Sequence, residues 1–77
     1  MQIEPVCALD IGTSKICALI ADLGEPDRVP RILGVGQAPA DGLRRGVVVD
    51  LDRTVRSIAQ SVTDADLMAQ LKVDRVI

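Results

Sequence analysis

The 77-residue sequence contains no Phe, Tyr, Trp or His. Aromatic side chains bury the largest apolar areas, so their absence leaves a core made only of aliphatic residues and Cys. A chain of this length buries about 60 % of its unfolded surface, and we therefore expect a thin core and marginal stability. The lack of His excludes a Cys–His nucleophile, and Cys7 and Cys17 do not have the spacing of a zinc site.

The sequence also lacks a strong excess of positive or negative charge. Nine basic and eleven acidic residues give a net charge of -2, which indicates neither a nucleic acid nor an anionic lipid surface as partner. No apolar run approaches the roughly 20 residues of a membrane span, and no basic stretch before an apolar segment marks a secretory signal. We expect a cytoplasmic chain whose two Cys residues pack as small hydrophobic side chains. A Cys7–Cys17 disulfide would need facing strands and an oxidising compartment.

Two apolar runs separated by a turn predict a β-hairpin near the start of the chain. Residues 6–9 and 16–21 are continuously apolar, as in strands covered on both faces. The six residues 10–15 between them include the Gly and hydroxyl residues of a turn. Residues 24–30, with one Gly, two Pro and three charges, predict a surface loop, and residues 31–38 predict a third strand.

The second half of the chain predicts one amphipathic helix of about five turns. Residues 39–42 read as a turn, and residues 43–49 as a lead-in with a short extended piece that ends at Asp50. Asp50 is suited to accept hydrogen bonds from the first helical turn, and Asp52 adds a favourable interaction with the helix dipole. Helical spacing forms one apolar stripe, which we expect to dock on the sheet. The stripe consists of Leu51, Val55, Ile58, Ala59, Val62, Ala65 and Ala69.

Residues 73–77 resemble the entrance to a further strand. A natural domain seldom finishes inside an apolar strand, because the strand would lack partners, so we interpret the chain as truncated. The order strand, strand, strand, helix, strand predicts an α/β layer with a hairpin-rich sheet and one crossover helix.

The tip of the predicted hairpin, residues 10–15, concentrates groups suited to phosphate chemistry. Gly12 permits close approach of the backbone to an oxyanion. The amides of Gly12, Thr13 and Ser14 are placed to converge on it, and the two hydroxyls add donors. The same residue types are also the ordinary composition of a hairpin turn, so both interpretations stay open.

Two charged residues flank this tip. Asp10 follows four apolar residues, where an unpaired carboxylate is unfavourable. Beside a phosphate it suits a ligand of Mg²⁺, direct or through water, because the cation separates the two negative groups. Lys15 neutralises phosphate charge if its side chain turns toward the tip, and is otherwise a solvated strand residue.

Four stretches resemble the FtsA family of actin-like bacterial cell-division proteins. Residues 8–20 resemble the family's first hairpin, residues 32–36 and 42–51 its third strand and helix entry, and residues 65–69 the end of its first helix. Sugar kinases and chaperone ATPases of the actin fold share the Asp-x-Gly-Thr turn but not the segment 42–51. The resemblance covers essentially all of the chain from about Val6 onward.

The resemblance implies that residues 1–77 are the amino-terminal part of the first subdomain of an actin-like (ribonuclease-H-like) domain. Full-length members bind ATP with Mg²⁺, self-associate into filaments and bind the tubulin-like protein FtsZ. They attach it to the inner membrane through a carboxy-terminal amphipathic helix, which is absent here, and recruit later division proteins. Such a protein is an adaptor of the division site and not an enzyme with a metabolic product.

Only the first phosphate-binding turn of the family carries over to this sequence. The resemblance assigns Gly12, Thr13, Ser14 and Lys15 to the nucleotide and Asp10 to the metal. A nucleotide held by one turn keeps most of its surface in water, so we expect weak or undetectable ATP binding by this chain alone.

Two alternatives remain open at this point. The chain is the start of another actin-fold ATPase, such as a carbohydrate kinase, if a catalytic carboxylate and a sugar pocket follow. It is a complete small module acting through its surface if residues 10–15 are a plain turn. Cooperative folding as a monomer would favour the second alternative.

Overall fold

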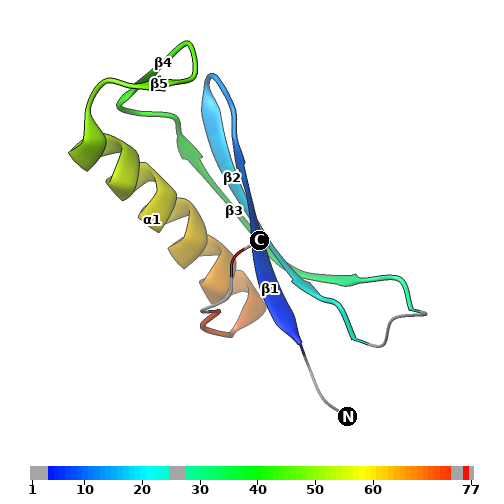
Figure 1. Cartoon of the computed structure of the whole chain (residues 1–77). Helices are drawn as coiled ribbons and strands as arrows, with labels where there is room; N and C mark the ends of the chain where they lie inside the picture. Colours follow the sequence, from blue (N-terminus) through cyan, green and yellow to red (C-terminus); the bar gives the residue numbers. More distant parts are fainter. Residues whose placement is uncertain (1–3, 25–27, 74–75, 77) are drawn as a thin grey trace.

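The computed structural model describes residues 4–24, 28–73 and 76, and shows one helix packed across one face of a twisted sheet (Figure 1). Helix and sheet form two layers, and the second face of the sheet is covered by no element of the described residues. The structure confirms the predicted α/β layer and is compatible with a part of an actin-like domain.

Three long strands form an antiparallel sheet in the order β1-β2-β3. They are β1 (Pro5–Ile11), β2 (Lys15–Asp22) and β3 (Arg31–Pro39). The predicted hairpin and third strand are therefore confirmed. Of the predicted loop 24–30, residues 25–27 lie outside the described residues.

The core lies between this sheet and the helix. Because side chains alternate between the two faces of a strand, one set of paired residues faces the helix. Cys7 is opposite Ile20 and Ile20 is opposite Gly34 in the register of the sheet. Ile16, Ala18, Ile20 and Cys7 are fully buried on this face.

The two Cys residues lie on opposite faces of the sheet. Cys7 pairs with Ile20 on the buried face, whereas Cys17 pairs with Asp10 on the other. Both thiols are free, and that of Cys7 is packed in the core. The expectation of packing as a small hydrophobic side chain is confirmed for Cys7, whereas Cys17 is only half-buried on the uncovered face. The alternation of the strand explains why the two thiols do not form a disulfide.

The predicted further strand falls partly outside the described residues, since only positions 73 and 76 of the range 73–77 are described. Val76 forms a parallel bridge with Cys7 of β1. The chain therefore returns to the edge of β1 after the helix, which is the expected result of a crossover connection between parallel strands.

The segment before the helix is a small hairpin and not one extended piece. Strands β4 (Leu43–Arg44) and β5 (Val47–Val48) pair with each other. Arg45 (φ 52°) and Gly46 (φ 79°) between them both have positive φ. Two such residues form the turn whose twist matches a hairpin. The local sequence predicts an extended piece only after a lead-in and does not predict the turn, because a non-glycine residue such as Arg45 seldom adopts a positive φ.

Helix α1 (Leu51–Ala69) begins where the sequence predicts and has the predicted five turns. The Asp50 carboxylate accepts a hydrogen bond of 3.1 Å from the Arg53 amide, as expected of an N-cap. The helix ends at Gln70, whose left-handed backbone (φ 56°) donates its amide to the last carbonyls of the helix. No helix in the described part of the chain is long and apolar enough to cross a membrane.

The face of α1 that docks on the sheet differs from the predicted apolar stripe. Leu51 and Val55 are 68 % and 54 % exposed. The buried residues of the helix are mostly small and polar: Thr54, Ser57, Ser61 and Ala65. The predicted stripe is confirmed at Ala65, Val62 and Ala69, which pack on the core, and is wrong at Leu51 and Val55. Apolar periodicity carries no information on how closely the helix and the sheet approach each other.

Two glycines of β3 set that approach. A Cβ atom at Gly36 would collide with the Ser61 carbonyl oxygen and lie 2.7 Å from the Ala65 amide nitrogen. A Cβ atom at Gly34 would collide with the Ala65 carbonyl oxygen. With backbone against backbone, only small helix residues fit the closest contact, and Leu51 and Val55 lie outside it.

Candidate functional site

The predicted phosphate turn is a short loop at the end of the β1–β2 hairpin. The Gly12 amide donates a hydrogen bond of 2.9 Å to the Lys15 carbonyl oxygen and closes the loop. The Ala40 amide donates one of 3.0 Å to the Ser14 carbonyl oxygen. The turn is thereby attached to the chain that follows β3, and Thr13 and Ser14 form its exposed tip.

The turn offers fewer free backbone donors than the three amides predicted from the sequence, those of Gly12, Thr13 and Ser14. The Gly12 amide is already bonded within the turn, which leaves the amides and hydroxyls of Thr13 and Ser14 for a ligand. Gly12 does not have a positive φ. A Cβ atom there would lie 3.0 Å from the Lys15 carbonyl oxygen, so the closeness of this carbonyl is enough to favour glycine.

Asp10 and Lys15 lie on the same face of the sheet. Asp10 is opposite Cys17, and Lys15 precedes Cys17 by two residues on β2, so all three point away from α1. Asp10 and Lys15 are both exposed, because no element of the described residues covers this face of the sheet. Neither residue forms an ion pair with any described residue. A carboxylate and an ammonium group are thus both accessible beside the tip.

A shallow pocket of about 290 Å³ adjoins the turn. Its lining residues are Ser14, Lys15, Gln37, Ala38 and Pro39. Gln37 was not among the predicted site residues. It reaches this place because it pairs with Cys17 across β2 and β3, and a register between distant strands is not visible in the local sequence of either strand.

The arrangement fits one edge of a phosphate site. Thr13, Ser14 and Lys15 present donors, and Asp10 offers one carboxylate to a hydrated cation. Among the described residues no three acidic, Cys or His side chains gather closely enough to hold a metal ion by themselves. A cation at Asp10 would therefore need oxygen ligands from water and from the phosphate, a common arrangement for Mg²⁺.

Comparison with known proteins gives one consistent result. The chain is 49 % identical over 71 residues to the cell division protein FtsA of Neisseria meningitidis, which is 92 % of this chain and 17 % of that protein. It is 37 % identical over 68 residues to FtsA of Pseudomonas aeruginosa, covering 88 % of this chain and 16 % of that protein. It is 37 % identical over 71 residues to FtsA of Escherichia coli, covering 92 % of this chain and 17 % of that protein.

These matches extend through the sheet and the helix and are not confined to the turn, since they cover about nine tenths of the chain. The chain spans only about a sixth of the length of the curated relatives that it matches. No protein-family model matches the sequence.

Proposed function

Because this chain belongs to the FtsA family of cell division proteins, we propose that it serves in bacterial cell division as part of an ATP-binding adaptor. The observation that carries the proposal is the identity of 37–49 % to proteins of that name over about nine tenths of the chain. The turn after β1 lies within the same segment and presents its polar groups to solvent.

We propose that the turn contacts the phosphates of ATP. The hydroxyls and amides of Thr13 and Ser14 donate to phosphate oxygens, and the Lys15 ammonium group offsets their charge. Asp10 holds the Mg²⁺ bound to the same phosphates, either by direct coordination or by accepting hydrogen bonds from water ligands of the ion. Gly12 shapes the turn through its hydrogen bond to the Lys15 carbonyl. Each role uses a group that the fold leaves accessible.

The remaining family properties are proposed for the full-length protein. They comprise binding to FtsZ, self-association into filaments, recruitment of later division proteins and attachment to the cytoplasmic face of the inner membrane through a carboxy-terminal helix. We propose an adaptor and not an enzyme with a metabolic product. The support is family membership, since this chain spans 15–17 % of the length of the relatives. No observation favours a carbohydrate kinase.

The proposal is tested by titrating the ¹⁵N-labelled chain with ATP in the presence and absence of Mg²⁺, and following the amide resonances by NMR. We expect millimolar or weaker binding, because one turn contacts only part of the nucleotide. The largest shifts should come from Thr13 and Ser14. We expect Mg²⁺ to strengthen ATP binding to the unaltered chain, and the Asp10→Ala variant should lose this effect. Asp64→Ala, which removes an exposed carboxylate of the helix, should keep it.

Circular dichroism of each variant establishes that the comparison is between folded chains. Shifts that avoid the turn, or a Mg²⁺ enhancement that persists in Asp10→Ala, would contradict the assigned roles. Micromolar binding by the chain alone would show instead that the turn is a self-sufficient nucleotide site and not part of a larger one.

A further inference from the structure

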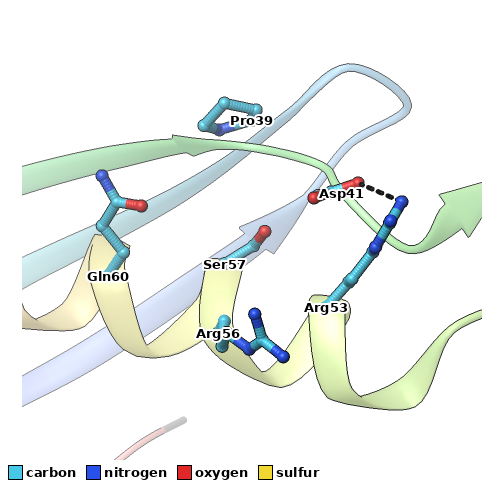
Figure 2. A pocket seen from close by; sticks show the side chains of 6 residues that line it. All are labelled: Pro39, Asp41, Arg53, Arg56, Ser57 and Gln60. Atoms are coloured by element: carbon cyan, nitrogen blue, oxygen red, sulfur yellow. Dashed lines mark ion pairs between the residues drawn. The ribbon is translucent and has the colours of Figure 1, made fainter.

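A second pocket, distinct from the hairpin turn, lies between the end of β3 and the first three turns of α1 (Figure 2). It has a volume of about 250 Å³, smaller than a typical pocket for a drug-sized ligand. Five of its six lining residues carry a polar or charged side chain. The lining residues are Pro39, Asp41, Arg53, Arg56, Ser57 and Gln60.

The Ser57 hydroxyl is the unusual group of this pocket. Ser57 is only 6 % exposed. Its two hydroxyl neighbours on the buried face bond to the helix backbone: Thr54 donates to the Asp50 carbonyl oxygen at 2.9 Å, and Ser61 to that of Ile58 at 2.8 Å. Within the described residues Ser57 forms no such hydrogen bond. No polar side-chain atom of the described residues is both fully buried and without a hydrogen-bond partner, so the Ser57 hydroxyl retains some access to solvent. It opens into the pocket and is directed toward the end of β3 (Figure 2).

The charged groups around this hydroxyl leave one cation uncompensated. Arg53 forms ion pairs with Asp41 at 3.8 Å and with Asp50 at 3.6 Å. The pair with Asp41 joins two residues that line the pocket (Figure 2) and reduces the repulsion that this carboxylate would exert on an anion. Arg56 has no ion pair with any residue that the structure describes.

The lining therefore supplies three kinds of donor on one side of α1. The Arg56 guanidinium group offers a planar pair of N–H donors, which matches the oxygens of a carboxylate or phosphate. The Ser57 hydroxyl adds a donor from the pocket floor, and the Gln60 amide adds one from the next turn. Gln60 follows Ser57 by three residues and Arg56 by four, the two spacings at which side chains are neighbours on a helix surface.

We propose that this pocket binds a small oxyanion, a carboxylate or a phosphate group, through Arg56, Ser57 and Gln60. The site is independent of the hairpin turn, although Pro39 lines the pockets at both places. A carboxylate ligand corresponds to an acidic side chain, and a phosphate ligand to a phosphorylated molecule or the free ion.

The test is an NMR titration of the ¹⁵N-labelled chain with sodium phosphate and, separately, with sodium acetate, each against sodium chloride at equal ionic strength. We expect millimolar binding with shifts concentrated at the amides of Arg56, Ser57 and Gln60. Arg56→Gln should weaken binding at least tenfold, and Ser57→Ala severalfold, since hydrogen bonds to a charged group are the stronger kind.

Two control variants separate this site from other positive groups. Arg31→Gln removes an exposed guanidinium group at the opposite end of β3, and Lys15→Gln removes the cation of the hairpin turn. Both should retain the shifts at the pocket. A response to phosphate alone identifies a phosphate site, and a response to both anions identifies a site that accepts carboxylates. Equal shifts with chloride, or shifts that persist in Arg56→Gln, would overturn the proposal.

Discussion

At the scale of single residues, the glycines of β3 decide how the helix packs. Replacing Gly36 by Ala places a methyl group against the Ser61 carbonyl oxygen and 2.7 Å from the Ala65 amide nitrogen. These are backbone atoms, which cannot rotate away, so the helix must move as a whole. We expect Gly36→Ala to lower the free energy of unfolding by about 3 kcal/mol, measured by urea denaturation.

Gly46→Ala is the matched control for this substitution. The Gly46 site has no atom within 4 Å of an added Cβ, and its positive φ of 79° is the only obstacle to Ala. That conformational strain costs about 1 kcal/mol. If the two variants lose equal stability, the close approach of helix and strand is not what makes glycine necessary at Gly36.

Cys7 gives the chain a dependence on alkaline pH. Burial raises the pKa of the Cys7 thiol above its ordinary value of 9.0, and the nearby Asp66 carboxylate raises it further. The folded state therefore retains a proton that the unfolded chain releases. This contribution to stability is fully present below the unfolded pKa and is lost as the pH rises from there through the folded pKa.

We accordingly expect the free energy of unfolding to fall as the pH rises above 9.0, the ordinary pKa of the thiol, by at most about 1.4 kcal/mol per pH unit from this group. Urea denaturation at a series of pH values measures the slope. Cys7→Ala should have lower stability at neutral pH but a shallower decline above pH 9. Cys17→Ala should keep the steeper decline, and an unchanged slope in Cys7→Ala would exclude Cys7 as its source.

At the scale of elements, much of the fold is predictable from local signals. Two apolar runs on either side of a Gly-Thr-Ser turn predict the β1–β2 hairpin, and a third, mostly apolar segment after a Pro-containing loop predicts β3. The start of the helix follows from Asp50, because a capping carboxylate before a periodic segment is a local property. The polar residues of the turn are recognisable for the same reason.

What the local sequence does not reveal are relations between distant elements. The docking face of α1 depends on Gly34 and Gly36, which lie on another strand. The position of Gln37 beside Lys15 depends on the β2–β3 register. The tight β4–β5 turn requires Arg45 to adopt a positive φ. In each case the three-dimensional context overrides the preference of the individual residue.

The N-cap gives a prediction that belongs to the helix as an element. Asp50→Ala removes the hydrogen bond to the Arg53 amide and an ion pair with its side chain. We expect a loss of about 1 kcal/mol in unfolding free energy, with Asp50→Asn nearly neutral because Asn also caps well. Asp52→Ala, which removes only a charge near the helix dipole, should cost about 0.5 kcal/mol. Equal losses in Asp50→Ala and Asp50→Asn would assign the effect to charge and not to capping.

At the scale of the whole molecule, apolar residues are exposed both at β5 and at the start of α1. From β5 into the first turns of the helix, Val47, Val48, Val49, Leu51 and Val55 are each 49–68 % exposed. Exposed apolar surface of this extent promotes association. A thin core built without aromatic side chains adds to the tendency to associate, since partial unfolding of the chain exposes still more apolar surface.

We therefore expect the chain to self-associate weakly, with a sedimentation coefficient that rises over the micromolar to millimolar range. The double variant Leu51→Lys, Val55→Lys places two charges among these exposed apolar residues. It should shift the association to at least tenfold higher concentration, with little change in unfolding free energy. Thr63→Lys adds a charge to an exposed helix position outside that group and should leave the association nearly unchanged. A chain that stays monomeric throughout, or a double variant that associates as before, would show that this surface does not drive self-association.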